Sequence, residues 1–378
     1  MEFGWTPQQQ AAYDGALAAA RSVLPDGFGT AEYYTRDHWR ALGEAGLLGA
    51  SVPVEYGGGG HGALDAALRF EAFGKGCPAT GLVFAAAAHL FACAMPIAEF
   101  GADAVRKELL PDLCAGRLVA ANAMTEPEAG SDVSRLATSA RKVPGGWVLD
   151  GLKNFVTNGP VADLCVTYAT TDPAAGHLGL TAFAVDTGTP GLLLGEPFAK
   201  MGMLACPAGT VEFRDCFVPD ERVLGAPGLG AVIFQQSMGW ERACLFALYL
   251  GLQDRLVEQV VAHVRERRQF GRRIAEFQSV SDRVVDMKLR LESGRLLLYR
   301  ACWEMDRGGS AVLPIALSKL QVSEAAVASA LDAVHLFGGR GYLAETGVEA
   351  ALRDAVPATL FSGSSEMQRR LVAAELGL

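Results

Sequence analysis

The sequence predicts a mainly α-helical protein with a central β domain, arranged in the order helical, β, helical. Apolar residues recur with a helical period towards both ends, whereas the middle contains short apolar runs separated by turn residues. The 378-residue chain is also too long for one ordinary hydrophobic core. We therefore expect an N-terminal helical domain at 1–118, a middle β-barrel or sandwich at 119–225 and a C-terminal four-helix bundle at 226–378.

The N-terminal part carries clear helix signals. Thr6 followed by Pro7 is a favourable start, because a hydroxyl can cap the first turn and proline fits its first position. A second helix is expected at about 34–46. The apolar stretch Thr80–Ile97 approaches the length that crosses a bilayer. Its many alanines and the polar His89 favour a buried helix of a large soluble protein instead.

The rest of the chain follows the same two patterns. Short apolar runs with turn signals between them predict strands in the middle part, at 146–150, 164–168, 180–185 and 210–214. Longer helical patterns predict three bundle helices in the last part, at 238–263, 280–305 and 311–336.

Composition excludes several function classes. The net charge of −9 argues against nucleic-acid binding. Eight cysteines without a Cys-x-x-Cys pair indicate free thiols in a reducing compartment, and six scattered histidines predict no metal site. Met1–Thr6 has no signal-peptide pattern, so we expect a cytoplasmic protein that does not insert into membranes. Neither a dinucleotide-binding glycine pattern nor a P-loop is present.

Two segments of the middle part are candidates for binding a polar, flat ligand. The turn-rich loop 124–133 carries the hydroxyls of Thr125 and Ser131 and lets backbone N–H groups approach a ligand closely. Further on, Phe155 and Thr157 lie two residues apart, which places an aromatic ring beside a hydroxyl on one strand face. An ordinary loop and a plain strand are the alternatives.

Three segments of the last part are further candidates. The arginine-rich run Arg265–Arg273 suits phosphate binding, although a solvated helix end that stops at Gly271 explains it equally. The run 335–342 has three glycines in four residues, which permits close approach to a ligand or simply stops a helix. The polar run 361–369 leads into the last helix and has a capping turn as its alternative.

In order and separation, these five segments resemble those of the acyl-CoA dehydrogenase family, and the resemblance covers essentially the whole chain. It implies FAD bound between the β domain and the C-terminal bundle, in a homodimer or homotetramer whose flavin sites use residues of two subunits. The residues that the resemblance implies for flavin contact are Met124, Thr125, Ser131, Phe155, Thr157, Arg267, Phe270, Gln278, His335, Gly339, Ser364 and Glu366. Ser131 is also implied to contact the pantetheine arm of the substrate.

The catalytic base is the main departure from the family pattern. Many relatives have a glutamate directly before the glycine matched by Gly363, but this chain has Ser362, whose hydroxyl is far too weak a base. Relatives similar to isovaleryl- and long-chain acyl dehydrogenases place the glutamate near the start of the first long bundle helix. Glu241 falls at that position, so we expect it to be the base, with Ser362 and Arg242 contacting the substrate. The alternative is that Glu241 only complements a helix terminus or a nearby cation.

The predicted activity is FAD-dependent α,β-dehydrogenation of an acyl thioester carried by CoA or an acyl carrier protein, with an electron-acceptor flavoprotein as a possible partner. The segment Trp240-Glu-Arg242 is similar to that of carrier-linked dehydrogenases of polyketide extender-unit biosynthesis. A flavin monooxygenase or oxidase on the same fold is one alternative, and a non-catalytic FAD-binding scaffold is another.

Overall fold

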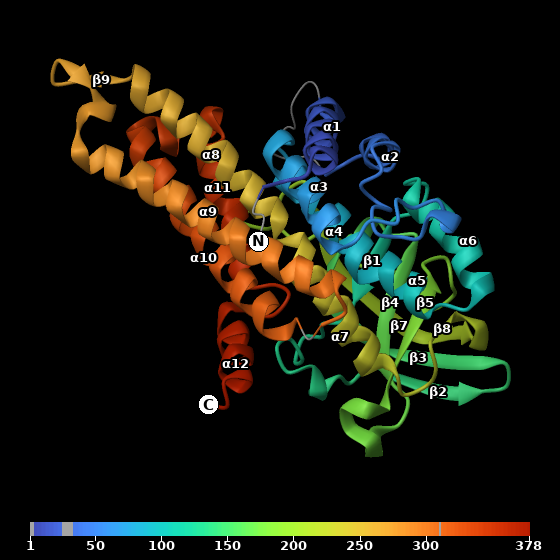
Figure 1. The fold of residues 1–378 in the computed structure, drawn as a ribbon. Coiled ribbons are helices and arrows are strands. Elements are labelled where there is room, and N and C mark those ends of the chain that lie inside the picture. The colour runs from blue at the N-terminus through green and yellow to red at the C-terminus, as the bar shows by residue number, and fades with distance from the viewer. Residues whose placement is uncertain (1–3, 25–32, 310) are drawn as a thin grey trace.

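The computed structural model describes residues 4–24, 33–309 and 311–378. Within these ranges, helices come first, an eight-stranded sheet follows, and long helices return (Figure 1), which is the predicted order. The first residues of Met1–Thr6, on which the signal-peptide prediction rests, lie outside the described ranges.

The N-terminal helices begin as the sequence predicts. The Thr6 hydroxyl accepts a hydrogen bond from the Gln9 N–H at 3.2 Å, and the Gln9 side chain returns a bond to the Thr6 N–H, so the first helix starts with a capping box. The helices of this part are α1 (Pro7–Val23), α2 (Arg36–Glu44), α3 (Ala63–Gly76), α4 (Thr80–His89), α5 (Met95–Phe100) and α6 (Asp103–Cys114).

The long apolar stretch is a core helix. Between α4 and α5 the chain makes one π-helical turn, η2 (Leu90–Ala94), so that the helical path runs over Thr80–Phe100. This is the one helix in the described residues that is long and apolar enough to cross a membrane, and its most apolar window is wholly buried. The prediction of a buried helix is confirmed.

The middle part is one twisted sheet in the order β6-β7-β3-β2-β4-β5-β8, with β1 paired to β4. The long strands β3 and β7 pair antiparallel, and a bulge between Lys153 and Val156 shifts their register by one residue. Such a bulge re-aims the side chains next to it. The strands are β1 (Ala120–Ala123), β2 (Ser139–Val143), β3 (Gly146–Thr157), β4 (Leu164–Thr170), β5 (Leu180–Asp186), β6 (Leu192–Leu194), β7 (Ala208–Pro219) and β8 (Val223–Leu224).

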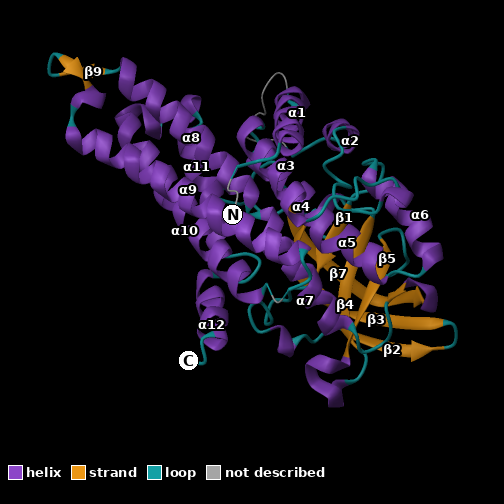
Figure 2. Cartoon of the chain, viewed as in Figure 1, coloured by secondary structure: helices purple, strands orange, loops and turns teal. Residues whose placement is uncertain are grey.

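The C-terminal helices extend away from the sheet (Figure 2). The helix predicted at 238–263 is in fact two helices separated by a π-helical turn, η7 (Glu241–Leu245), because one extra residue interrupts the α-helical hydrogen bonds. The helical elements of this part are α7 (Gly230–Trp240), α8 (Ala247–Glu266), α9 (Gln278–Asp306), α10 (Val312–Phe337), α11 (Val348–Ala355) and α12 (Ser365–Glu375).

The arginine-rich segment differs from its prediction. The helix does not continue to Gly271 but ends at Glu266, and a small hairpin follows, made of β9 (Arg268–Gln269) and β10 (Arg272–Arg273). Phe270 and Gly271 both have positive φ, 51° and 79°, which closes a tight turn between the two strands. The glycine is therefore a hairpin residue and not a helix stop.

The N-terminal helices and the C-terminal bundle share one core, whereas the β domain has a smaller core of its own. Helices α3 and α8 approach closely because glycines replace side chains at their contact. A Cβ on Gly74 would lie 2.1 Å from the Leu248 carbonyl oxygen, and one on Gly251 would lie 2.0 Å from the Glu71 carbonyl oxygen. This close contact fixes the N-terminal helices on the bundle helix that follows Glu241.

Candidate active site

Glu241, Arg242 and Ser362 come together at the start of η7, although they are distant in sequence. The Glu241 side chain is buried, and the Ser362 hydroxyl donates a short hydrogen bond to its Oε1. The Nε–H of Arg242 donates to the Ser362 carbonyl oxygen at 2.8 Å. Glu241, predicted as the base, and Ser362, which stands where the resemblance implies the usual base, are thus direct neighbours.

The turn that carries Ser362 is tightly held. Ser362 and Gly363 both have positive φ, 54° and 84°, and a Cβ on Gly363 would lie 2.8 Å from the Gln368 amide nitrogen. That amide group donates to the Gly363 carbonyl oxygen at 2.9 Å. Ser364 then caps α12 by accepting a bond from the Met367 N–H. Glycine therefore allows the close approach that orients Ser362 towards Glu241.

The electrostatic surroundings of Glu241 suit a base. Burial raises the pKa of the Glu241 carboxyl above its usual range, and this effect exceeds the opposing influence of the Ser362 hydrogen bond, Arg242 and Lys319. Burial likewise lowers the pKa of the Arg242 guanidinium. A desolvated carboxylate that still has cations nearby is both a stronger base than one in water and able to remain ionised.

Aromatic rings fill the space beside this turn. Phe361, which precedes Ser362, packs against Phe84 with ring centres 4.5 Å apart and against Phe246 at 5.5 Å. Tyr249 lies 6.3 Å from the same ring. Phe84, Phe246, Tyr249 and Phe361 thus form an aromatic cluster next to the turn that carries Ser362.

A buried ion pair holds the loop 124–133 against the sheet. Lys153 donates to the Glu126 carboxylate at 2.8 Å and to the Met124 carbonyl oxygen at 3.3 Å. The Glu126 carboxylate also accepts bonds from the N–H groups of Ala137 and Thr138. Burial acts to raise the pKa of Glu126, but Lys153 and these donors outweigh it and lower that pKa. The carboxylate is therefore ionised and fully bonded.

The residues predicted to flank the flavin lie beside this loop. The Asn154 N–H donates to the Thr125 carbonyl oxygen at 2.7 Å, which joins the strand end to the loop. Phe155 has φ 53° and is 69% exposed, whereas Val156 is buried and Thr157 is half-buried. An exposed aromatic ring near a hydroxyl suits contact with a flat ring system that has polar edges. Ser131 is exposed in the same loop.

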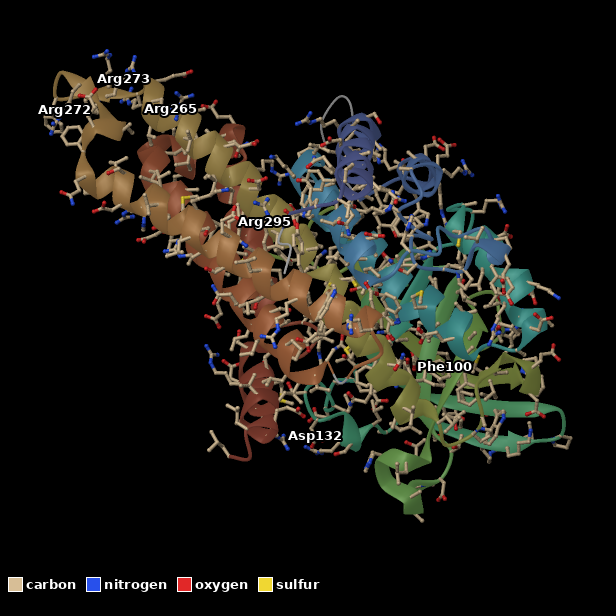
Figure 3. All side chains as sticks on the ribbon, in the orientation of Figure 1. Phe100, Asp132, Arg265, Arg272, Arg273 and Arg295 are labelled. Atoms are coloured by element: carbon tan, nitrogen blue, oxygen red, sulfur yellow. The ribbon has the colours of Figure 1, made fainter. Side chains whose placement is uncertain are left out.

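The second set of predicted flavin residues lies at the opposite end of the molecule. Arg267, Phe270 and Gln278 are exposed on the hairpin and at the start of α9, and Phe270 is 93% exposed. Figure 1 and Figure 3 show this hairpin, with Arg272 and Arg273, at the far end of the bundle from the sheet. One chain therefore does not bring its own two sets together.

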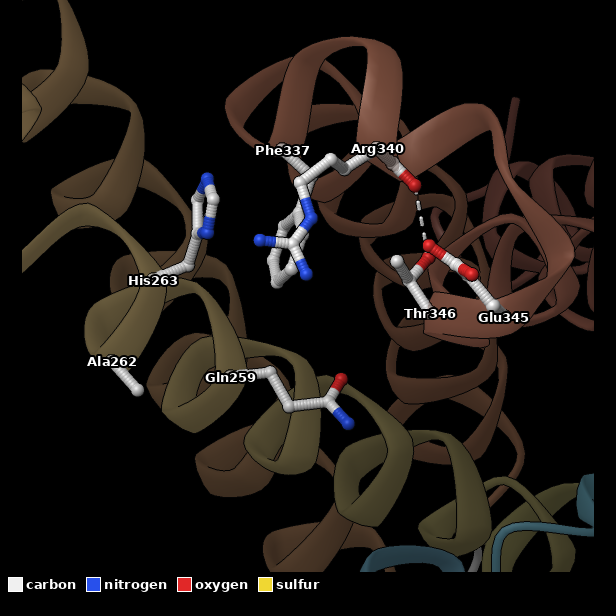
Figure 4. Close-up of a pocket in the computed structure, with 7 residues that line it drawn as sticks. All are labelled: Gln259, Ala262, His263, Phe337, Arg340, Glu345 and Thr346. Carbon is white, nitrogen blue, oxygen red and sulfur yellow. Dashed lines mark hydrogen bonds between the residues drawn. The ribbon is translucent and has the colours of Figure 1, made fainter. Parts of the chain in front are cut away.

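The glycine-rich segment lies at this same end of the bundle. His335 contacts the Arg283 guanidinium at 2.9 Å, and Gly339 is exposed in the turn after α10. Next to it is an open cavity of about 620 Å³, where the rings of His263 and Phe337 stack at 4.2 Å (Figure 4). The lining residues are Gln259, Ala262, His263, Phe337, Arg340, Glu345 and Thr346.

The residues present fit FAD if two chains contribute to one site. In the β domain, Phe155 offers an exposed ring, and Thr125, Ser131 and Thr157 offer hydroxyls for the flavin. At the hairpin, Arg267 and its neighbouring arginines offer exposed guanidinium groups of the kind that bind a pyrophosphate. Ser364 and Glu366, also predicted to contact FAD, lie at the start of α12, where Glu366 is exposed.

Sequence reasoning missed three charged residues that the structure places in or near the site, namely Glu126, Lys153 and Lys319. All three are buried. The available signal for Lys319 was a single lysine within the apolar stretch 312–322, and for Lys153 a lysine at a core-facing strand position. Neither signal reveals the surroundings of the lysine, because these surroundings include residues distant in sequence.

The fold and the site together define a flavin-dependent dehydrogenase of acyl thioesters. Models of the N-terminal, middle and C-terminal domains of acyl-CoA dehydrogenases match residues 6–117, 121–216 and 228–377. The chain belongs to the acyl-CoA dehydrogenase family. The predicted family, the helical–β–helical fold class and the enzyme class are confirmed.

Individual relatives and solved structures show which members of the family this chain is similar to. An L-prolyl-[peptidyl-carrier protein] dehydrogenase of Pseudomonas fluorescens is 52% identical over 96% of both chains. The solved structure "PigA with FAD and proline" has a TM-score of 0.96 and 40% identity over all of both chains, and it supports the predicted FAD cofactor. The prolyl acyl carrier protein oxidase AnaB has a TM-score of 0.95 and 38% identity over 99% of this chain and all of its own.

Proposed function

We propose that this enzyme oxidises the Cα–Cβ bond of an L-prolyl group that is bound as a thioester to a peptidyl carrier protein, with Glu241 as the base. The hydrogen bond between Ser362 and the buried Glu241 carboxylate supports the proposal, because it joins a carboxyl of raised pKa to the turn before Gly363, where the resemblance implies the base. The prolyl substrate and the carrier are suggested by the similar dehydrogenase of Pseudomonas fluorescens.

The chain's own residues provide the proton chemistry. Glu241 removes the α-proton of the acyl thioester, and the Ser362 hydroxyl holds the carboxylate in place. We expect the Ser362 N–H to donate to the thioester oxygen, since that donor does not depend on the side chain. FAD, when bound, accepts the hydride that leaves the β-carbon. The products are an α,β-unsaturated thioester, a protonated Glu241 and a reduced cofactor.

The aromatic cluster supports a small acyl group. Phe361, directly before Ser362, packs against three other aromatic rings, and we infer that this cluster borders the place of the acyl group. A five-membered ring is compact and has an apolar face that can lie against aromatic rings. We therefore expect straight chains longer than a few carbons to be poor substrates.

The decisive experiment is an anaerobic titration of the flavin absorbance with a panel of thioesters. The panel contains L-prolyl, D-prolyl, butyryl, isovaleryl and octanoyl groups, each loaded both on a peptidyl carrier protein and on CoA. We expect L-prolyl on the carrier to bleach the flavin fastest. Faster bleaching by a straight-chain acyl-CoA would contradict the proposed substrate.

An oxidase is the second candidate, because the similar protein AnaB is named an oxidase. The two candidates differ in how the reduced flavin is reoxidised, by molecular oxygen or by an electron-acceptor flavoprotein. Reducing the enzyme with substrate and then mixing it with aerated buffer separates them. Reoxidation within one turnover time indicates an oxidase, and slow reoxidation indicates a dehydrogenase. The raised pKa of the buried Glu241 carboxyl gives no support to the monooxygenase and scaffold alternatives.

Two further parts of the proposal concern assembly and location. A homo-oligomer is supported by the separation of the two flavin-contact sets and by an exposed apolar row along α9, formed by Val285, Leu289, Leu296 and Trp303. A cytoplasmic location is supported by eight cysteines that are all buried and unpaired within the described residues. We also keep the domain limits 1–118, 119–225 and 226–378 as proposed boundaries.

A further inference from the structure

Lys319 is a buried cation without a bonded partner. It lies on α10 with its side chain fully buried, and its ammonium has no hydrogen-bond partner among the residues that the structure describes. The nitrogen lies 5.1 Å from the ring centre of Phe246. Burying a charged group in this way is costly, and a neutral side chain would fill the same space at lower cost.

The position of Lys319 links it to the active site. Phe246 directly follows η7 and packs on Phe361, the residue before Ser362. Helix α10 also contacts both η7 and α12. The charged groups that act on Lys319 come from these three elements and are Arg242 and Glu241 on η7, Glu324 on α10, and Glu366 on α12.

The groups around Glu241 show what Lys319 contributes. Arg242 and Lys319 are the two cations that act on the Glu241 carboxylate, and the Ser362 hydroxyl donates to it. The Glu241 carboxylate also acts on Cys93 on η2 and Tyr168 on β4, and burial is the main cause that raises the pKa of both, so they remain neutral. Arg242 already donates to the Ser362 carbonyl oxygen. Lys319 is thus a cation near the base that is not engaged in another hydrogen bond within the described residues.

We propose that Lys319 is a positioning residue whose buried positive charge keeps the Glu241 carboxylate ionised and thereby sets the lowest pH at which the enzyme abstracts the α-proton. The inference rests on the proposed role of Glu241. Burial lowers the pKa of Lys319 to about 8, so the ammonium is still mainly protonated at neutral pH. Its charge opposes the burial of Glu241, which on its own favours the protonated carboxyl.

The test compares FAD-loaded wild type with Lys319→Met over a range of pH. Anaerobic stopped-flow measures flavin reduction by the L-prolyl thioester of a peptidyl carrier protein. Without the cation the acidic limb of the rate profile should move to higher pH, and each pH unit of that movement corresponds to a tenfold loss of rate on its acidic side. The rate on the alkaline plateau should stay within about twofold of wild type.

Matched variants separate charge from packing. Lys319→Arg keeps the charge and should retain the wild-type limb, and Lys319→Gln is a second neutral variant in case methionine disturbs folding. Ser329→Ala alters another buried polar side chain of α10 without changing charge, so its limb should not move. A readout without turnover is pH-difference infrared spectroscopy of the protonated Glu241 carboxyl, identified by its loss in Glu241→Gln. In Lys319→Met this signal should persist to higher pH.

The inference is overturned if either neutral variant is folded and loaded with FAD yet keeps the wild-type rate limb and the wild-type infrared titration. A uniform rate loss at every pH, with a lower melting temperature, would also overturn it, since that pattern indicates a purely structural role. Failure of the proposed function looks different, because Glu241→Gln would then reduce its flavin as fast as wild type.

Discussion

The Ser362 hydroxyl donates a hydrogen bond to the Glu241 carboxylate, and the two residues are 121 positions apart in the chain. The serine that directly precedes Gly363 thus bonds to a glutamate from another helix. Because a serine can donate to a carboxylate but cannot replace it as a base, the two residues should differ sharply in their importance for catalysis.

Replacing Glu241 tests that ranking directly. Glu241→Gln keeps the shape of the side chain but removes the base, so flavin reduction by the L-prolyl thioester should fall by at least about 100-fold while FAD remains bound. Ser362→Ala leaves the base in place and removes only one hydrogen bond to it, so its effect on flavin reduction should be clearly milder than that of Glu241→Gln. Anaerobic stopped-flow of both variants provides the comparison. An active Glu241→Gln beside an inactive Ser362→Ala would refute the proposed mechanism.

Shared flavin sites predict complementation between two defective chains. Arg267→Ala should weaken FAD retention by about 1.5–3 kcal/mol, the value of a charge-assisted contact, in the site of the neighbouring subunit. A mixed dimer of Glu241→Gln and Arg267→Ala chains then contains one site with both wild-type residues. Co-expression with two affinity tags, followed by two purification steps, should yield oligomers that are FAD-loaded and active.

The control for this experiment pairs Glu241→Gln with Phe155→Ala. Both residues are expected to serve the site of their own chain, so each site in the mixed dimer is damaged and activity should not return. Equal recovery in the two mixtures, or recovery in neither, would argue against flavin sites built from two subunits.

Ser131 should affect substrate binding more than turnover. Its hydroxyl is exposed in the loop 124–133, where the pantetheine arm is expected to pass. Ser131→Ala should therefore raise KM while kcat holds, the signature of an interaction made equally in the ground state and the transition state. Ser134→Ala is the matched control, because Ser134 lies just after this loop and its hydroxyl is already engaged with Asp132. An unchanged KM for Ser131→Ala would contradict the predicted contact between Ser131 and the pantetheine arm.

The buried pair Lys153–Glu126 should dominate the stability of the middle domain. Lys153→Met leaves the Glu126 carboxylate buried without its cation, which should cost about 3–5 kcal/mol, measured by urea denaturation. The exposed pair Arg214–Glu212 is the control, and Arg214→Met should cost far less, because water screens an exposed ion pair. Similar costs for the two variants would contradict the prediction.

The pH dependence of this pair has a definite sign. The pKa of Glu126 is lowered in the folded protein, so its contribution is present above the pKa of the unfolded chain and is lost as the pH falls through the folded value. The stability difference between wild type and Lys153→Met should therefore shrink on acidification below the usual carboxylate range.

The order of domains could be predicted from the sequence because a periodic apolar pattern extends over many residues and survives local exceptions. Local departures from this periodic pattern could not be predicted from the sequence. The helix predicted at 238–263 contains a π-helical turn that inserts one residue without interrupting the apolar run. Residues 268–273 form a hairpin, and the sequence could not distinguish it from a helix end because glycine suits a positive φ in both structures.

The candidate site was predictable only where local segments resemble a known family. Glu241 and Ser362 could each be named from such segments, but their hydrogen bond depends on how η7 and the turn before α12 pack together. Burial of a charge is harder still to predict. Lys319 and Lys153 are ordinary lysines in the sequence, and their surroundings become visible only when distant elements assemble.

The π-helical turn at Glu241 also has a consequence for how such a site can change over generations. A turn of this kind holds one residue more than an α-helix needs, so removing a single residue there restores regular helix without breaking the chain. The deletion would rotate the helix on one side of it, relative to the helix on the other side, about the common axis by the angle that one residue spans. A carboxylate at this position could thus turn towards or away from the opposite segment in a single insertion or deletion step, while both flanking helices keep their packed faces.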